Sequence, residues 1–190
     1  MNISRTNIHT IIEHIVPFDA LERDDVASIL VWIDGDEGLY RRAKPNVPAK
    51  HLVSYFVLVD RVRRSVLLMD HRLSGLWLPT GGHVEPDEDP HETVVRELQE
   101  ELGTRAALVV SVGATPLFVT ANVTNGQGAH TDVSLWYVCF GDERMWIDPD
   151  PREFSGHRWM SFEAVLDMDI DELDPGMHRF IHKLDAALDD

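Results

Sequence analysis

The sequence predicts an α+β fold in which helices and strands are mixed without a regular alternation. Apolar residues recur at helical spacing near both ends of the chain, and β-rich runs dominate residues 52–140. These runs do not alternate regularly with helices, so an α+β arrangement or an α/β sandwich is favoured over a doubly wound sheet. A chain of 190 residues is long enough for one domain with an added segment.

Residues 1–47 are expected to form a helical extension. Isoleucines recur at helical spacing over residues 4–16, and Pro17 ends that pattern. Residues 19–33 repeat it. We expect these helices to cover the main core, and a homodimer contact is the alternative. Residues 48–190 are then expected to form the main domain.

The main domain is expected to contain five strands and two helices. The expected strands are residues 52–59, 65–69, 106–112, 116–123 and 132–140. Polar residues 60–64 separate the first two strands and predict a hairpin between them. One helix is expected at residues 90–102, and a last helix with one apolar face at about residues 175–188.

Charge and cysteine content exclude several classes of protein. The chain has 17 Lys and Arg against 33 Asp and Glu, a formal net charge of −16. This balance argues against nucleic-acid polymers and anionic membranes as partners. The single cysteine, Cys139, excludes an internal disulfide and is expected to be a buried thiol. No apolar stretch approaches the roughly 18 residues of a membrane span, and the N-terminus does not resemble a secretory signal, so a cytoplasmic location is expected.

The helix at residues 90–102 has well-marked ends and one acidic side. Asp89 is a suitable N-cap, Pro90 suits the first helical position, and Gly103 suits the position just after the helix. Apolar residues four apart predict that the helix packs on a core. The stripe consists of Val94, Leu98 and Leu102.

Glu97, Glu100 and Glu101 are related by i, i+3 and i+4 spacing and share an arc roughly 100° wide. The like-charge pair Glu97 and Glu101 costs a few tenths of a kcal/mol in an isolated helix. Arg96 is expected to point about 100° away from Glu97, outside this arc. A divalent cation would turn the repulsion into coordination, because Mg²⁺ and Mn²⁺ prefer oxygen ligands. A merely solvated acidic face is the alternative.

Residues 81–104, GGHVEPDEDPHETVVRELQEELGT, resemble the Nudix box, G-x5-E-x7-R-E-U-x-E-E-x-G-U, where U is a bulky aliphatic residue. The matching positions are Gly82, Glu88, Arg96, Glu97, Leu98, Glu100, Glu101 and Gly103. Thr104 at the final U position is a departure that concerns local packing. The likeness spans about residues 50–188, and the helical extension lies outside it.

The resemblance implies a Nudix-type α/β/α sandwich with a mixed β-sheet, and a MutT-like pyrophosphohydrolase. It implies hydrolysis of a nucleoside diphosphate derivative by water attack on a phosphorus of the pyrophosphate. It also implies that Arg96 and Glu88 brace the loop, and that Gly82, Leu98 and Gly103 are structural positions of the box. The implied ligands of Mg²⁺ or Mn²⁺ are Glu97, Glu100, Glu101 and the backbone carbonyl of Gly81.

The chemistry of a pyrophosphate explains why such a site needs both metal and carboxylates. Metal ions lower the negative charge that repels hydroxide and acidify a bound water, and a nearby carboxylate takes the proton. Together with this chemistry, the resemblance implies that the catalytic residues are Glu100, Glu97 and Arg96, with Glu100 and Glu97 equally favoured as the general base. Further candidates for the base lie in later loops: Glu143, Glu153 and Asp132.

The sequence leaves the substrate open. Nucleoside triphosphates, ADP-ribose, nucleotide sugars and dinucleoside polyphosphates all contain the cleaved group. His83 and His130 are candidates for substrate contacts, and the histidines lack the His-x3-His spacing of a helical zinc site. A Nudix-fold module that senses a nucleotide without cleaving it is the alternative function. A third hypothesis is a structural partner protein that associates through its N-terminal helices.

Overall fold

The structure is a computed structural model that describes residues 5–43, 46–103, 111–124 and 129–189. The chain divides into two compact units whose segments interleave along the sequence. Unit 1 consists of Met1–Tyr55, Gly82–Val94 and Ala114–Tyr137, and unit 2 of Phe56–Gly81, Val95–Gly113 and Val138–Asp190. The predicted boundary between an extension and a main domain at residue 47 stays a prediction.

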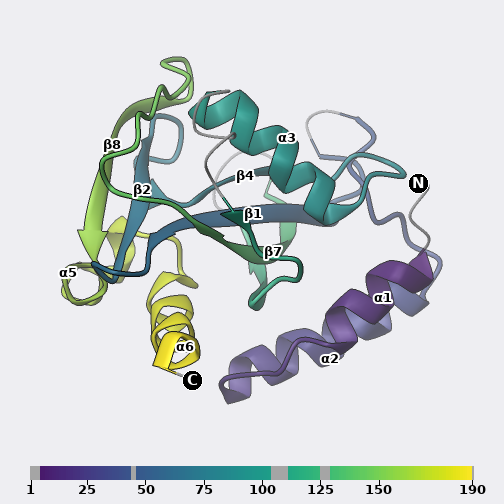
Figure 1. Ribbon diagram of the computed structural model, residues 1–190. Coiled ribbons are helices and arrows are strands. Elements are labelled where there is room, and N and C mark those ends of the chain that lie inside the picture. The colour runs from purple at the N-terminus through teal and green to yellow at the C-terminus, as the bar shows by residue number, and fades with distance from the viewer. Residues whose placement is uncertain (1–4, 44–45, 104–110, 125–128, 190) are drawn as a thin grey trace. The chain divides into compact units, whose positions relative to one another are not determined.

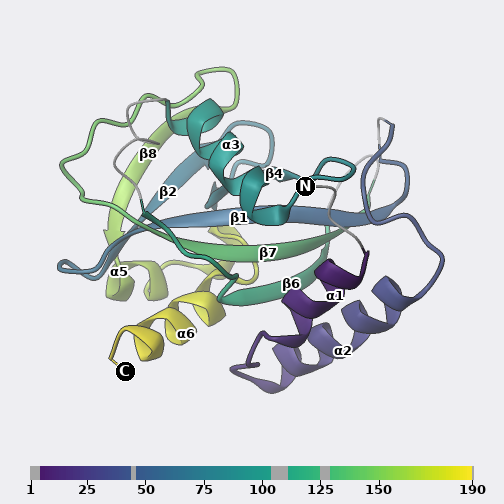
Figure 2. The same cartoon turned by 45° about the vertical axis from the view of Figure 1, so that its right-hand side comes forward.

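Two helices open unit 1 and lie side by side (Figures 1 and 2). They are α1 (Arg5–Glu13) and α2 (Ala20–Asp34), which confirms the two helices expected there. Four isoleucines of the sequence pattern are fully buried: Ile8, Ile12, Ile29 and Ile33. Apolar burial of this kind, rather than helix propensity alone, stabilises short helices.

A reciprocal hydrogen-bond arrangement begins α2. The Asp19 Oδ1 accepts a hydrogen bond from the backbone N–H of Glu22 at 2.7 Å, and the Glu22 carboxylate accepts one from the N–H of Phe18 at 2.7 Å. The Glu22 side chain is fully buried, and its other oxygen accepts a hydrogen bond from the N–H of Val119 at 3.4 Å. Glu22 therefore connects the start of α2 to strand β6 (Phe118–Val123), against which α2 packs.

Backbone hydrogen bonds join the strands of unit 1 in pairs. Strand β7 (Thr131–Phe140) pairs antiparallel with β6 from Phe118 opposite Trp136 to Val123 opposite Thr131. Strand β4 (Thr80–His83) pairs with β1 (Lys50–Asp60). The N–H of Val84 donates to the carbonyl of Leu52 at 3.2 Å, and the N–H of Thr131 donates to that of Ala49 at 2.7 Å.

The strands of unit 2 centre on β2 (Ser65–His71). This strand forms the expected hairpin with the end of β1, where Asp60 lies opposite Ser65. It also pairs antiparallel with β8 (Phe154–Ser161) and with the short β3 (Trp77–Leu78). Strand β5 (Ser111–Val112) pairs with the end of β7. Most of the strand expected at residues 106–112 lies outside the described residues.

The hydrogen-bonded strand order is β3-β2-β1-β7-β5, with β4 on β1, β6 on β7 and β8 on β2. A mixed sheet accompanied by helices, with helices at the N-terminus, confirms the predicted α+β class. Strand β1, strand β7 and the helix α3 (Pro90–Leu102) each contribute residues to both units.

Unit 2 ends in helices. After α5 (Phe162–Leu166) and the short 3-10 helix η1 (Ile170–Glu172), the last helix α6 covers Met177–Asp189, close to the expected range. Arg64, in the β1–β2 turn, forms ion pairs with Asp185 and Asp189 on α6. The apolar face of α6 is buried through Met177, Phe180, Ile181 and Leu184.

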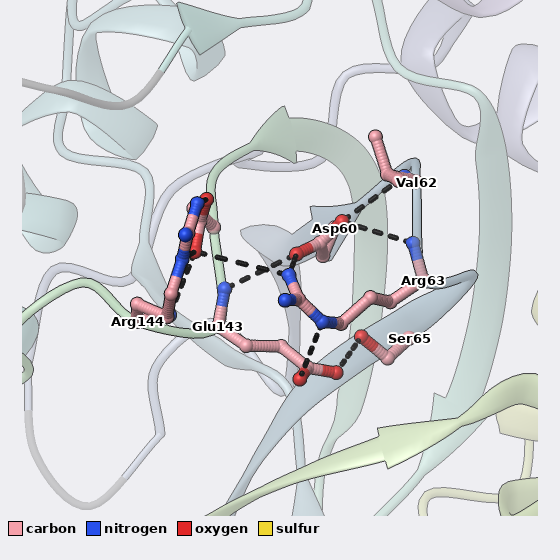
Figure 3. A network of polar contacts seen from close by, with 7 residues as sticks. Asp60, Val62, Arg63, Ser65, Glu143 and Arg144 are labelled. Carbon is pink, nitrogen blue, oxygen red and sulfur yellow. Dashed lines mark hydrogen bonds and ion pairs between the residues drawn. The ribbon is translucent and has the colours of Figure 1, made fainter.

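A polar network holds the β1–β2 turn together (Figure 3). The Asp60 Oδ1 accepts hydrogen bonds from the backbone N–H groups of Val62 and Arg63, each at 3.0 Å. Its Oδ2 accepts from the Arg63 guanidinium at 2.9 Å and from the N–H of Glu143 at 3.3 Å. Burial alone would raise the pKa of Asp60, but the hydrogen bonds from Arg63, Glu143 and Val62 outweigh it and lower the pKa.

Two further observations bear on the expectations from composition. Cys139 is fully buried, as expected, and burial raises the pKa of its thiol to about 12. Among the described residues, no helix combines the length and the apolar character that a membrane crossing requires.

Candidate catalytic and metal sites

Helix α3 has the ends that the sequence predicts. The Asp89 Oδ1 accepts a hydrogen bond from the N–H of His91 at 2.9 Å, which caps the first turn. The helix ends at Leu102, and Gly103 has a φ of +86°. Glycine adopts this left-handed conformation without the steric cost that a side chain adds. The buried residues of the helix include Val94, Leu98 and Leu102, the predicted apolar stripe.

Glu88 fastens the turn that leads into α3. One of its carboxylate oxygens accepts hydrogen bonds from the N–H of Glu85 at 3.0 Å and from the hydroxyl of Thr93 at 2.7 Å. The same turn contains Asp87 at a φ of +68°. Charge-assisted hydrogen bonds of this kind are stronger than those between neutral groups, so Glu88 braces the approach to the helix.

Glu101 joins the helix to the glycine turn. Its side chain is buried, with 7% of the residue exposed, and its Oε2 accepts a hydrogen bond from the N–H of Gly81 at 3.0 Å. Burial, followed by the negative charges of Glu97 and Glu153, raises the pKa of Glu101 to about 9. The structure therefore brings Gly81 and Glu101 together, as a shared metal site requires.

Arg96 lies among the box glutamates, and the expectation that it points away from the acidic arc was wrong. Its guanidinium Nη1 is 2.5 Å from the Oε1 of Glu97 and 3.6 Å from the Oε2 of Glu100. Helical position fixes where the arginine stem begins, but its long flexible side chain lets the charge reach a neighbouring arc. Arg96 thus offsets part of the repulsion among these acids.

The box acids differ in their surroundings. The side chain of Glu97 is 13% exposed and that of Glu100 is 61% exposed. Burial raises the pKa of Glu97, and Arg96 opposes that shift while Glu100 and Glu153 add to it. The set therefore combines buried carboxylates at the helix with an open one facing solvent.

Glu153, just before β8, is the later-loop acid whose charge acts on the box. Its negative charge contributes to the raised pKa of both Glu97 and Glu101. Glu143 instead takes part in the turn network, where its Oε1 accepts a hydrogen bond from the Ser65 hydroxyl at 2.5 Å (Figure 3). Of these two acids, the structure favours Glu153 for chemistry at the box.

The acids fit a hard divalent cation. Burial first, and then the negative charges of Glu97 and Glu153, raise the pKa of Glu101, and a cation bound between the carboxylates would offset both effects. Oxygen is the donor that Mg²⁺ and Mn²⁺ prefer. The predicted ligand roles of Glu97, Glu100, Glu101 and Gly81 stay predictions that this geometry supports.

A second cluster contains both histidines that were considered for substrate contacts. His83 and His130 meet His51 and Asp132, with one donor atom from each of the four within 4.8 Å of the others. The ring of His51 lies 5.0 Å from that of His130 and 4.9 Å from that of His83, between ring centres. Burial, then the positive charge of Arg41, lowers the pKa of His83 to about 4.

Sequence reasoning missed this cluster because its members are far apart along the chain. A local signal existed in the spacing of His130 and Asp132, since residues two apart in an extended segment share one face and His130 directly precedes β7. Nothing in the sequence alone pairs that face with His51 and His83, which other strands contribute.

Comparison with known proteins decides the family. A family model described as a NUDIX domain matches residues 50–184. The chain belongs to the Nudix family. This membership confirms the resemblance that the box predicted, and it extends well beyond the box.

Individual relatives of this Nudix chain differ in their named activities. It is 30% identical over 148 residues to an isopentenyl-diphosphate Delta-isomerase from Roseobacter denitrificans, covering 73% of this chain and 80% of that protein. It is 46% identical over 108 residues to an RNA pyrophosphohydrolase from Gluconacetobacter diazotrophicus, covering 50% of this chain and 63% of that protein. The chain thus spans less than two thirds of the pyrophosphohydrolase.

Solved structures show the same fold. A NUDIX-family hydrolase from Clostridium perfringens aligns with a TM-score of 0.58 at 20% identity, over 72% of this chain and 97% of that one. A Caenorhabditis elegans Ap4A hydrolase aligns with a TM-score of 0.57 at 16% identity, over 72% of this chain and 96% of that one. At these identities the likeness establishes the Nudix fold alone.

Proposed function

We propose that this Nudix protein is a Mg²⁺- or Mn²⁺-dependent pyrophosphohydrolase that acts on a nucleoside diphosphate derivative. The main support is the buried Glu101, which accepts a hydrogen bond from Gly81 and carries a strongly raised pKa beside Glu97 and Glu153. A buried carboxylate crowded by like charges is costly unless a cation binds there. Relatives named as RNA and CTP pyrophosphohydrolases support the same reaction class.

The ligand roles follow from the placement of these groups. We assign the cation to the carboxylates of Glu97, Glu100 and Glu101, with the backbone carbonyl of Gly81 as a further ligand. When bound, the cation lowers the charge on the diphosphate, positions it and acidifies a water molecule. Arg96 holds Glu97 in place through its ion pair, so its role is to position a ligand.

A carboxylate must accept the proton of the attacking water. Arg96 contacts Glu97 closely, and an ion-paired carboxylate is a poorer base than an unpaired one. Glu100 has a longer contact with Arg96, at 3.6 Å, and a more exposed side chain, so Glu100 and Glu153 are the favoured bases. Replacing Glu153 with Gln should lower kcat and remove the acidic limb of the pH–rate profile if Glu153 is the base. An unchanged profile assigns the proton transfer to Glu100.

The direct test replaces Glu101 with Gln. This change removes a ligand charge and keeps the side-chain shape, so turnover with Mg²⁺ should fall by about 100-fold or more. Glu92→Gln, at an exposed position of the same helix, is the matched control and should retain activity. Circular dichroism establishes that both variants are folded. Full turnover by Glu101→Gln with metal present would falsify the metal role.

The substrate is identified by a panel with product analysis. The panel contains nucleoside triphosphates, ADP-ribose, nucleotide sugars and dinucleoside polyphosphates, each with Mg²⁺ or Mn²⁺. The net charge of −16 disfavours a nucleic-acid polymer, so an RNA oligonucleotide with a 5′-triphosphate is included as the opposing case. Preferred hydrolysis of that oligonucleotide would contradict a small-molecule substrate.

The same assay tests two alternative functions, diphosphate isomerisation and nucleotide sensing without cleavage. The isomerase relative matches 73% of this chain, so isopentenyl diphosphate belongs in the panel, with double-bond isomerisation as the readout. A non-catalytic nucleotide sensor would show ligand-induced thermal stabilisation without any product. The complete set of box acids argues against the sensor, because a protein that only binds nucleotides need not keep every metal ligand.

A further inference from the structure

Three strands of unit 1 and the residue just before β7 bring together His51, His83, His130 and Asp132, none of which belongs to the box glutamates. His51 lies in β1, His83 ends β4, and Asp132 lies in β7. Two backbone hydrogen bonds hold these strands in register beside the cluster, from Val84 to Leu52 and from Thr131 to Ala49. The four side chains therefore meet where backbone hydrogen bonds hold neighbouring segments together.

The Nδ1 atom of the His51 ring faces a backbone carbonyl oxygen. His51 Nδ1 is 3.0 Å from the carbonyl oxygen of Pro48, which can only accept, so Nδ1 carries the proton. The opposite nitrogen, Nε2, is 3.3 Å from the Oδ1 of Asp132. Within the described part of the chain, these two buried atoms have no hydrogen-bond partner. Such atoms are costly unless something satisfies both, and a cation does so.

His130 also has an acceptor for its Nδ1–H, the hydroxyl of Thr124. The Nδ1 of His130 is 2.8 Å from the Thr124 hydroxyl, which also lies 3.3 Å from the carbonyl of His130. When the hydroxyl donates to that carbonyl, it accepts from Nδ1–H. The other nitrogen, Nε2, is then directed to the Oδ1 of Asp132 at 3.1 Å. Metal-binding histidines typically use one nitrogen for such an outer partner and the other for the ion.

We propose that His51, His83, His130 and Asp132 bind a divalent transition-metal ion of the zinc class, with a ligand set separate from the box glutamates. Imidazole nitrogen favours zinc, iron, nickel and copper, whereas a set of carboxylates alone favours magnesium and manganese. Tetrahedral zinc bonds of about 2.0–2.1 Å place neighbouring ligand atoms about 3.3 Å apart. The contacts of 3.3 Å and 3.1 Å to Asp132 match that spacing.

The ligand set also indicates what the ion does. Three nitrogens and one carboxylate oxygen would fill a tetrahedral shell from the protein alone and leave no position open for water, which favours a structural over a catalytic ion. The ion would cross-link β1, β4 and β7, which supply His51, His83 and Asp132. This inference does not depend on the proposed hydrolysis, because its tests measure metal binding rather than turnover.

The first test uses the full-length wild-type protein, stripped of metal by a chelator and titrated with Co²⁺. We expect one tightly held equivalent with the intense visible absorption of a tetrahedral nitrogen–oxygen site. Zn²⁺ should displace it, and excess Mg²⁺ should not. A weak octahedral spectrum, or displacement by Mg²⁺, would overturn the proposal. A zinc-soaked crystal adds a second readout, since the absence of an anomalous peak among the four side chains also overturns it.

Variants assign the ligands. His51→Gln and Asp132→Asn should each weaken Co²⁺ binding by more than the roughly 10- to 100-fold that loss of an outer partner costs. His182→Gln, at an exposed position of α6, is the matched histidine control and should bind Co²⁺ like the wild type. Glu101→Gln should also retain the tight Co²⁺ site while losing hydrolysis. Wild-type affinity in His51→Gln and Asp132→Asn, or loss of the site in Glu101→Gln, contradicts the assignment. If the cluster variants do not fold, the wild-type spectrum and the anomalous peak decide.

Discussion

At the scale of single residues, burial and neighbouring charges explain why the pKa of one buried acid rises and that of another falls. Glu101 is buried and crowded by like charges, yet its backbone partner Gly81 holds it in place. Asp60 is equally buried, but its partners lower its pKa. The two acids differ because Asp60 is surrounded by donors and Glu101 mainly by other acids. The first arrangement stabilises the fold, and the second favours binding of a cation.

Replacing Glu101 with Gln should therefore strengthen the metal-free fold. Because burial and neighbouring charges raise its pKa to about 9, Glu101 takes up a proton on folding at pH 8, which costs stability. The amide of Glu101→Gln avoids that cost and its oxygen can still accept from the Gly81 N–H. We expect the free energy of unfolding at pH 8, with chelator present, to rise by about 1 kcal/mol. Urea denaturation measures it, with Glu92→Gln as control. A clear loss of stability would show that Glu101 is stabilising as a carboxylate.

Asp60 should make stability depend on pH in the opposite sense. Its pKa is lower in the folded protein than in the unfolded chain, so ionised Asp60 stabilises the fold above about pH 4, and this is lost as pH falls through the folded pKa. Asp60→Asn should cost about 1–3 kcal/mol at pH 7 and distinctly less at pH 3. Urea denaturation at both pH values tests this. Asp36→Asn, at an exposed position, should change little, and an equal cost at both pH values contradicts the mechanism.

The residue scale also shows a limit of sequence reasoning. A helical wheel fixes the direction of each Cβ, and it placed Glu97, Glu100 and Glu101 on one arc. The wheel does not fix where a long side chain ends, so it failed for Arg96, whose guanidinium reaches two of these acids. Short or branched side chains are predictable in this way, and arginine is not.

At the scale of elements, strong local sequence signals were sufficient to predict several helices and turns with their bounds. The bounds expected for α3 are those observed, because a capping residue and a left-handed glycine mark its ends. The hairpin at Asp60 and the last helix followed from turn chemistry and periodicity in the same way. The strands β3 and β4 and the helix α5 were not predicted separately, because segments of two to five residues are too short to show a period.

The end of α3 gives an element-scale prediction. Gly103→Ala forces a side chain into the left-handed region at a φ of +86°, which should cost about 1–2 kcal/mol of unfolding free energy. The new Cβ would lie 3.6 Å from the Cβ of Asp148, an ordinary contact, so the cost comes from the backbone. Gly156→Ala, which meets nothing within 4 Å, is the matched control. Equal effects of the two changes in thermal unfolding would contradict this explanation.

At the scale of the whole molecule, the two candidate sites differ in how far sequence alone could reveal them. The box is contained in one continuous segment at fixed spacing, so the sequence showed it. The histidine cluster joins β1, β4 and β7, and strand pairing brings its members together. A site of that kind is visible only once the sheet is known.

The N-terminal helices give a prediction at this scale. Deleting residues 1–46 removes the buried isoleucines of α1 and α2 and the contact of Glu22 with β6. We therefore expect a lower melting temperature, because each lost apolar contact costs stability. Calorimetry measures it, and light scattering on the intact chain tests the homodimer alternative. An unchanged melting temperature together with loss of a dimer would favour association as the role of these helices.

The burial of Cys139 has a practical consequence for labelling experiments on this protein in solution. Thiol-directed dyes and spin labels react with the thiolate, which a buried group with a pKa of about 12 scarcely forms at neutral pH. A cysteine introduced at an exposed position would then be the one that reacts. Fluorescent or paramagnetic reporters can be attached at chosen points of the native sequence, without first replacing the natural thiol.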